Sequence, residues 1–480
     1  MYRKREREQL TIDDFVLPFG GKLLASNRWV KLAAMMPWDY IEDIYAESMC
    51  LDNGAPAISS RIAFGSNIIK ENENLTDERT LEHIAENAYM QYFLGLREFT
   101  SELLFDPSMM THFRKRFPAD KVEEINKRIF AAEKKEQDDD DEDRPETPEN
   151  KGKLVLDATA APADIRYPSD LSLLNEAREN TEKMIDELFA RHGKSGRRTH
   201  YSRKKARSKY LAIAKQKKPG AAKKKAAKRE QIGYIEGNMK IIVAILTETG
   251  MEGFPQKRLD RLLTIRELLA QQKEMLEKNT TRVDNRIVSL RQPHVRPIVR
   301  GKAGKKYEFG QKLAFSVVNG YTFIEKQSFD SFNEGITLIE SAKAYRQRTG
   351  CWPEVIQADQ IYRNKDNRNF CKEHGIRLSG PRLGRPGPDA ERNRALELQD
   401  NCERNIIEGR NGMVKRRFGL DLIMAYLPET ALTEAAINVL CMNAKIRILL
   451  RCLFASRSWQ LTPREIYGFF RGPYITPNFF

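Results

Sequence analysis

The sequence of 480 residues is 40% hydrophobic and 31% charged, a composition that supports packed cores and excludes a wholly disordered chain. Lysine and arginine outnumber the acids 82 to 67, and 17 of these cations lie between Arg191 and Arg229, a segment without Asp or Glu. That segment favours a polyanionic partner, either nucleic acid or an acidic membrane surface. No apolar run is long enough to span a membrane and none follows the basic start, so we expect a cytoplasmic protein without a membrane helix or secretory signal.

Residues 1–125 have the apolar periodicity of helices. Thr76 is a predicted N-cap, and Asp106 followed by Pro107 predicts another helix start. The helix after Pro107 ends in three cations, Arg114, Lys115 and Arg116. Short helices with a basic end are typical of a helix-turn-helix-like DNA-binding module. The alternative is an ordinary helical domain with a solvated basic turn.

Two segments of biased composition follow. Residues 126–150 contain six consecutive acids, Asp138 to Asp143, followed by prolines, and we expect an extended linker because like charges repel one another. Residues 166–285 have helical periodicity around the cationic segment and are predicted to form a helical insertion with a basic rim. The apolar faces between residues 235 and 276 are our predicted oligomer interface.

Strand patterns lie on both sides of the predicted insertion. The apolar run from Leu154 to Leu156 ends in Asp157, and the run from Val355 to Ala358 ends in Asp359. Such short apolar runs, closed by polar residues, are typical of buried strands.

Further strands complete the predicted sheet. We expect one at 287–290 and a hairpin at 309–318 and 321–327, whose Asn319-Gly320 pair suits a type I′ turn. Residues 151–165 and 286–460 are therefore predicted to form one mixed α/β domain, and residues 461–480 a C-terminal tail.

A helical segment near the end of the chain carries a third acid, Glu408. Arg404 lies four residues before it and Lys415 seven residues after it, which places the three side chains within about 60° on one helix face. A carboxylate between two cations suits a metal ion beside a phosphodiester backbone. Gly409 and Gly412 each cost the helix roughly 1 kcal/mol relative to Ala, so an interruption of the helix is expected there. The alternative is a salt-bridged surface helix without a catalytic role.

Several motifs, in order, resemble those of prokaryotic insertion-sequence DDE transposases. They span roughly residues 30–450 and comprise YMQYFLGL at 89–96, FDPS at 105–108, FRKR at 113–116, DAT with a following proline at 157–162, EFG at 308–310 and ADQIY at 358–362. Arg404, Glu408 and Lys415 match the R-x3-E-x6-K part of the family signature Y-x2-R-x3-E-x6-K, in which Asn401 replaces the tyrosine.

The resemblance implies an RNase H-like catalytic domain in which Asp157, Asp359 and Glu408 bind two Mg²⁺ ions, with Mn²⁺ as a substitute. Hard cations prefer oxygen ligands, and two of them can activate the attacking oxygen and stabilise the leaving oxygen. The resemblance also implies hydrolysis at transposon ends, followed by attack of the new 3′-OH on target DNA. Alanine at any of the three acids is expected to abolish end cleavage while end binding survives.

Other cations are assigned to the DNA backbone. Phosphate contacts are expected from Arg404 and Lys415, from the basic end of the N-terminal module, and from these further residues: Arg197, Arg198, Arg203, Lys204, Lys205, Arg207, Lys209, Arg382 and Arg385. We expect double-stranded DNA as the partner, both transposon ends and target, bound by a homodimer that is associated with the nucleoid. The alternatives are a non-catalytic DNA-binding repressor of transposition and a metal-dependent nickase without strand transfer.

Overall fold

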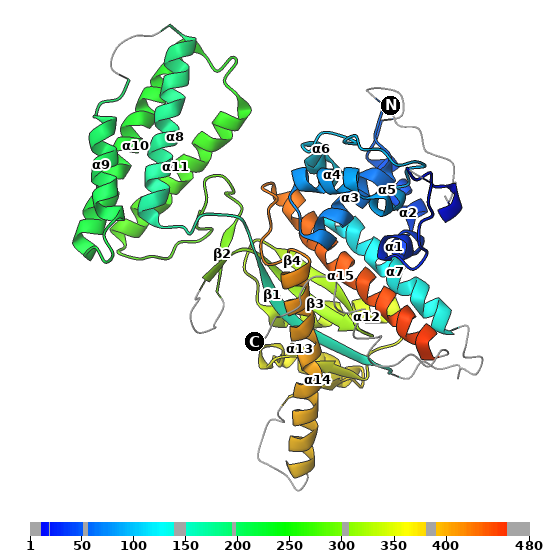
Figure 1. Cartoon of the computed structure of the whole chain (residues 1–480). Coiled ribbons are helices and arrows are strands. Elements are labelled where there is room, and N and C mark those ends of the chain that lie inside the picture. The colour runs from blue at the N-terminus through cyan, green and yellow to red at the C-terminus, as the bar shows by residue number, and fades with distance from the viewer. Residues whose placement is uncertain are drawn as a thin grey trace, which may run out of the picture.

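The computed structural model describes residues 11–18, 20–50, 56–138, 150–193, 198–299, 307–380 and 390–457. Figure 1 shows a central sheet, a group of N-terminal helices beside it, and a helical lobe (green) that stands apart from both. The architecture is therefore mixed α/β. Among these residues, no helix combines the length and the apolar character needed to cross a membrane.

The N-terminal part is helical. It contains the 3₁₀ turn η1 (Ile12–Asp14) and the helices α1 (Arg28–Met35), α2 (Trp38–Glu47), α3 (Ser60–Glu73), α4 (Asp77–Glu86), α5 (Ala88–Phe93), α6 (Met109–Arg116) and α7 (Ala119–Asp138). The predicted cap is confirmed, because the Thr76 hydroxyl accepts a hydrogen bond from the backbone of Arg79.

Two predicted boundaries in this part are wrong. Helix α6 begins at Met109 and not at Pro107, because Asp106 closes a turn by accepting the backbone N–H of Ser108. Helix α7 continues to Asp138 through half of the predicted linker, since its apolar face is buried against the rest of the protein. The acids from residue 139 onward lie outside the described residues.

One mixed sheet forms the centre. Its strands are β1 (Lys153–Pro162), β2 (Arg296–Val299), β3 (Tyr307–Val318), β4 (Tyr321–Ser328), β5 (Val355–Gln357) and β6 (Arg377–Leu378). They lie in the order β2-β3-β1-β5-β6, with β4 also paired to β3. Strand β1 is antiparallel to β3 and parallel to β5. The predicted hairpin is confirmed, with φ of +49° at Asn319 and +83° at Gly320.

The prediction of a strand at residues 287–290 is wrong. Ile287 and Leu290 are buried in an irregular segment that packs onto the lobe. The backbone N–H of Ile287 donates to the Gln271 side chain at 2.9 Å, so its hydrogen bond is satisfied without a neighbouring strand.

Helices cover both faces of the sheet. They and two short 3₁₀ turns are η2 (Glu334–Thr337), α12 (Leu338–Thr349), η3 (Gln360–Tyr362), α13 (Lys365–Glu373), α14 (Ala390–Arg417) and α15 (Pro428–Arg457). Alternate residues of a strand point to opposite faces. Leu154 and Leu156 of β1 therefore join the core under α12, whereas Val155 joins the core that contains residues of α14 and α15.

The N-terminal helices share that second core with α15 and the sheet. Helix α15 packs against α1, α3, α6 and α7, as Figure 1 shows. The contact includes a buried charged cluster, in which Lys70 Nζ of α3 lies 2.6 Å from Glu71 and 3.2 Å from Glu434 of α15. The helical module is thus built onto the sheet through a common core.

The lobe consists of α8 (Asp170–Arg191), α9 (Arg203–Ala214), α10 (Ala221–Thr249) and α11 (Gln256–Glu277). Its helices enclose two apolar cores of their own. Ile235, Ile242 and Ile265 belong to these cores and are fully buried. The prediction that the apolar faces between residues 235 and 276 form an oligomer interface is therefore wrong, because those faces pack against one another and against α8.

Candidate active site

Asp157 lies within β1, and Asp359 follows β5, the strand parallel to β1. Strands β1 and β5 pair Val155 with Gln357. Asp157 lies two residues beyond Val155 in β1, and Asp359 lies two residues beyond Gln357, just after β5 ends. The parallel pairing of β1 with β5 therefore brings two acids that are far apart in the sequence to the same region of the sheet.

Asp157 lies half-buried on the sheet face that α14 covers. Asn411 of α14 donates its Nδ2 hydrogen to Asp157 Oδ2 at 2.9 Å. Burial, together with the negative charges of Glu334 and Asp359, raises the pKa of Asp157 to about 6, although the charge of Arg404 opposes this. Asp157 therefore belongs to a group of three neighbouring acids.

Asp359 follows β5 and starts the η3 turn. Its carboxylate forms an ion pair with Arg404 of α14, with 2.5 Å between Oδ1 and Nη1. Its side chain is 52% exposed, whereas that of Arg404 is 20% exposed. The cation that we predicted to contact phosphate is thus already engaged with an acid of the same site.

Glu408 lies on α14 between the two residues that contact the aspartates. Arg404, Glu408 and Asn411 fall within about 60° on one helix face. Lys415 lies on the same face, about two turns after Glu408. The helix is unbroken from Ala390 to Arg417, so the predicted interruption at Gly409 and Gly412 is wrong. Glu408 itself is exposed.

The carboxylates of Asp157, Asp359 and Glu408 are not arranged as a preformed metal site. Within the described ranges, no three His, Cys, Asp or Glu side chains are arranged so that they could hold one metal ion. The structure brings Asp157 and Asp359 together and places Glu408 on the facing helix, while Arg404 supplies the positive charge beside Asp359.

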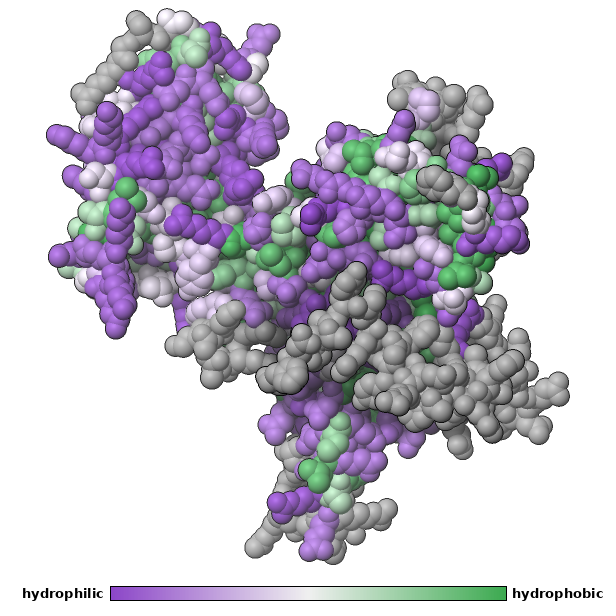
Figure 2. All heavy atoms as spheres, viewed as in Figure 1, coloured by the Kyte–Doolittle hydropathy of each residue, from purple (hydrophilic) through white to green (hydrophobic). Residues whose placement is uncertain are grey.

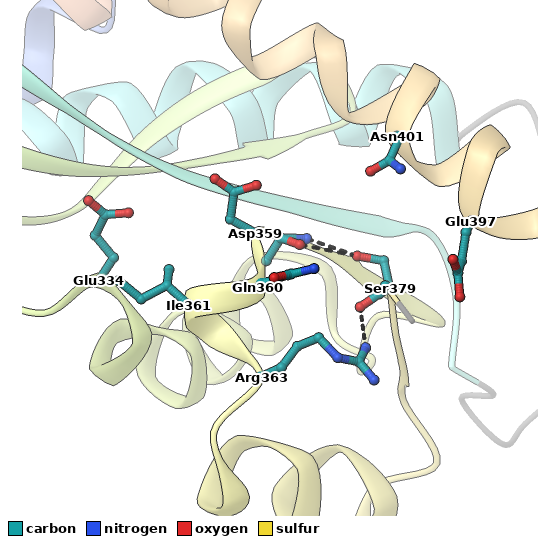
Figure 3. Close-up of a pocket in the computed structure, with 10 residues that line it drawn as sticks. Glu334, Asp359, Gln360, Ile361, Arg363, Ser379, Glu397 and Asn401 are labelled. Carbon is teal, nitrogen blue, oxygen red and sulfur yellow. Dashed lines mark hydrogen bonds between the residues drawn. The ribbon is translucent and has the colours of Figure 1, made fainter. Parts of the chain in front are cut away.

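Three residues of the site were missed from the sequence. Asn411 lies seven residues after Arg404, so helical periodicity was the signal that could have identified it. Glu334 forms an ion pair with Lys312 at 2.9 Å, and no motif or spacing pointed to either residue. Glu334 and Asp359 both line a pocket of about 510 Å³. Figure 3 shows the two carboxylates directed toward the same side of this pocket, at the end away from Glu397.

The donor set suits a hard divalent cation. Carboxylate and amide oxygens are the ligands that Mg²⁺ accepts in proteins. Asn411 Oδ1 is buried and has no hydrogen-bond partner in the described part of the chain, although Nδ2 of the same amide is bound to Asp157. Arg404 pairs with Asp359 and Lys312 pairs with Glu334, so two cations face three acids, and the remaining negative charge fits such a cation.

The basic end of α6 is largely turned inward. Arg114 is 5% exposed, and its two terminal nitrogens donate to both oxygens of Asp77 at 2.9 and 2.7 Å. Arg116 donates to the Tyr45 hydroxyl at 2.9 Å. Lys115 is exposed and lies 3.7 Å from Glu429. Of these three predicted DNA contacts, Arg114 is buried, Arg116 is half-buried and Lys115 is exposed.

The predicted contacts of the lobe fall into two groups. Arg198 and Arg203 both form ion pairs with Asp186, at 3.0 and 2.8 Å, and Lys209 forms one with Glu230. The second group is exposed and makes no ion pair with any described residue: Lys204, Lys205 and Arg207. Figure 2 shows that the visible face of the lobe is largely hydrophilic. Three other predicted contacts lie outside the described residues: Arg197, Arg382 and Arg385.

Comparisons with known proteins identify the family of the chain. A family model described as "Transposase DDE domain" matches residues 356–445, and one described as "Transposase domain (DUF772)" matches residues 19–116. The chain is 30% identical over 148 residues to the uncharacterized protein ORF8 in nfe locus of Rhizobium meliloti, which covers 31% of this chain and 68% of that protein. No solved structure was found to match. The chain belongs to the DDE transposase family.

Proposed function

We propose that this transposase binds the inverted repeats of an insertion sequence, cleaves its ends by metal-dependent phosphodiester hydrolysis and joins the 3′-OH to target DNA. The observation that carries the proposal is that Asp157 of β1 and Asp359, just after the neighbouring strand β5, both contact α14, the helix that bears Arg404 and Glu408. In this proposal the mixed sheet is the RNase H-like core implied by the sequence resemblance.

Each side chain has a distinct role in the proposal. Asp157, Asp359 and Glu408 would hold two divalent ions, Mg²⁺ or Mn²⁺, whose charge activates the attacking oxygen and stabilises the leaving oxygen. Asn411 orients the Asp157 carboxylate through its hydrogen bond. Arg404 neutralises Asp359 in the free protein and binds a non-bridging phosphate oxygen when DNA enters, since charge-assisted hydrogen bonds to phosphate are strong.

The proposed chemistry has two steps at one site. Water attacks the phosphorus at the transposon end, the bond from phosphorus to O3′ breaks, and the leaving oxygen takes up a proton to become a 3′-OH. This hydroxyl then loses its proton as it attacks a target phosphodiester, and a target 3′ oxygen leaves. Neither step requires a covalent protein intermediate.

In the proposal, the helical lobe contacts the phosphate backbone of DNA. Lys204, Lys205 and Arg207 are exposed on α9, where they can bind phosphates without regard to sequence. A homodimer would present two active sites to the two ends of the element.

A joining assay tests the proposed function. A labelled duplex that carries the inverted repeat from the DNA flanking the gene is incubated with the protein, Mg²⁺ and a supercoiled target plasmid. The proposal predicts labelled plasmid, and none when a chelator is added. Nicked duplex without joining would indicate a nickase, and a bound but intact duplex would indicate a non-catalytic DNA-binding protein.

A further inference from the structure

Gln357 is a buried glutamine at the end of β5, two residues before Asp359. It is 1% exposed. Its Nε2 donates to Asp400 Oδ1 at 3.1 Å and to Glu403 Oε2 at 2.7 Å, and both acids belong to α14. A buried amide is costly unless hydrogen bonds satisfy it. The amide of Gln357 is satisfied by α14 and thereby ties β5 to this helix.

Two cations from the neighbouring strands bind the same two acids. Arg377 of β6 donates to both oxygens of Asp400 at 2.5 and 2.8 Å, and Asp400 is 4% exposed. Lys153 of β1 pairs with Glu403 at 2.6 Å. Hydrogen bonds from Lys153 and Gln357 lower the pKa of Glu403 to about 2, so this acid stays charged at neutral pH. These five residues form a polar clamp that connects three adjacent strands to one turn of α14.

The polar clamp lies directly before the active-site residues of α14. Asp400, Arg404 and Glu408 follow one another at intervals of four residues, so they lie along one strip of the helix with about 6 Å between successive positions. Asn401, the residue after Asp400, lines the pocket that Asp359 also lines, as Figure 3 shows. The clamp therefore fixes the stretch of α14 that leads into Arg404 and Glu408.

Helix α14 needs such a fixed point, because Figure 1 shows it projecting beyond the sheet. Residues 394–399 are exposed or half-buried, whereas Asp400 is buried. Apolar contacts are non-directional and let a helix shift over a sheet, but hydrogen bonds have a preferred geometry and hold one register. The polar clamp is therefore placed to stop movement of α14 where this helix meets the sheet.

We propose that Gln357 is a positioning residue for the transposase reaction, because its bonds to α14 set where Glu408 stands relative to Asp359. This inference rests on the proposed function, since it assumes that end cleavage uses these two acids. The competing explanation is that the polar clamp only adds to the stability of the fold.

Single-turnover cleavage of a labelled transposon end by the full-length protein, with Mg²⁺ and saturating protein, tests the inference. Gln357→Leu keeps the approximate volume of the side chain and removes the amide. It should lower the rate constant of cleavage by about 10- to 100-fold, because misplaced groups act poorly on the reacting phosphate. The Kd for the DNA end should stay within about twofold of the wild-type value, since most phosphate contacts lie elsewhere.

The matched control is Gln311→Leu, which removes a buried amide from the same sheet. Gln311 of β3 is also 1% exposed, and it donates to the carbonyl of Ala431 of α15 at 2.9 Å. Both variants should lower the Tm, and the assays are run well below both values. Gln311→Leu should leave the rate constant of cleavage within about twofold of wild type. Equal falls in the two variants, or wild-type cleavage by Gln357→Leu, overturn the inference.

Hydrogen–deuterium exchange in the protein without DNA gives a readout that does not depend on catalysis. Gln357→Leu should speed exchange about fivefold in the α14 peptide that spans residues 400–408. Gln311→Leu should leave that peptide unchanged. Unchanged exchange in Gln357→Leu would show that the amide does not hold α14, and this result also overturns the inference.

Glu403→Ala serves if Gln357→Leu fails to fold, because Glu403 is 30% exposed and its loss is easier to accommodate. This variant removes the acceptor that Gln357 and Lys153 share, and it should slow cleavage by at least about threefold with an unchanged Kd for the DNA end. Cleavage at the wild-type rate by Glu403→Ala overturns the inference.

Asp359→Asn distinguishes failure of this inference from failure of the proposed function. If Asp359→Asn does not cleave and Gln357→Leu cleaves as the wild type does, the positioning role alone is overturned. Wild-type cleavage by Asp359→Asn overturns the proposed function and the positioning role together.

Discussion

The basic end of α6 and the basic helix α9 have similar sequences but use their cations differently. In α6, Arg114 is buried and bound to Asp77, because that turn packs against α3 and α15, where Glu71 and Glu434 are also buried. In α9, only Ala206 and Tyr210 face the lobe, so Lys204 and its neighbours point to solvent. A run of cations in a sequence therefore indicates a polyanion partner only where no internal acid has already bound it.

The largest expected effect is the loss of stability when the buried cation Arg114 is replaced. Arg114→Met should lower the free energy of unfolding by about 3–5 kcal/mol, because Asp77 and the buried acids nearby lose a compensating charge. Urea unfolding measures this. Lys115→Met, the adjacent exposed cation, should change the value by less than about 0.5 kcal/mol. Equal effects of the two variants would contradict the distinction.

Replacing the exposed cations of α9 should change the affinity for DNA. The combined variant Lys204→Gln, Lys205→Gln and Arg207→Gln should leave thermal stability unchanged. It should reduce the slope of log affinity against log salt by about 0.9 for each phosphate contact that is lost. The control with equal charge change combines three exposed cations of α10 and α11: Lys240→Gln, Lys257→Gln and Arg266→Gln. If both triple variants change the slope equally, net charge and not the α9 surface is responsible.

A smaller effect should appear in the pH dependence of stability. Burial raises the pKa of Glu123 on α7 to about 8, above the value of about 4.3 expected in the unfolded chain. Between these two pKa values the folded protein keeps the Glu123 proton and the unfolded chain has lost it. The free energy of unfolding therefore falls as the pH rises from about 4.3 to about 8. The wild-type Tm should fall by roughly 2–4 °C between pH 6 and pH 9, and Glu123→Gln should remove most of that fall. An identical pH profile in the variant would show that Glu123 does not titrate in this range.

The smallest effect concerns the cations of the lobe that are tied to an acid. Asp186→Asn should release Arg198 and Arg203 from their ion pairs, and the affinity for duplex DNA should rise by about two- to threefold at low salt, since exposed ion pairs are worth less than about 1 kcal/mol. Fluorescence anisotropy measures this change. A fall in affinity would mean that Asp186 positions these arginines for DNA instead of competing for them.

Local signals predicted the parts of the structure that depend on local chemistry. The Thr76 cap and the turn at Asn319-Gly320 are each specified by a few adjacent residues. Asp359 follows its strand as predicted, whereas Asp157 does not end its strand, because β1 continues to Pro162. The same logic misassigned residues 287–290, because an apolar run can also be buried without pairing in a sheet.

The contacts that complete the site depend on chain packing. Arg404 was placed on the correct helix face, but its partner Asp359 could not be read from spacing within that helix. Glu334 lines the same pocket as Asp359, and the buried amide of Asn367 bridges its turn η2 to the η3 turn that follows Asp359. No pattern within either segment contains that information.

The most direct test of the account uses a DNA end that is already cleaved and carries a free 3′-OH. Asp157→Asn, compared with the exposed-acid control Asp366→Asn, is assayed with Mg²⁺ for joining of this end to a plasmid. The account predicts that Asp157→Asn binds the end but neither cleaves an intact end nor joins the pre-cleaved one, while Asp366→Asn does both. Joining at the wild-type rate by Asp157→Asn would contradict the account, because strand transfer would then not depend on the Asp157 carboxylate of β1.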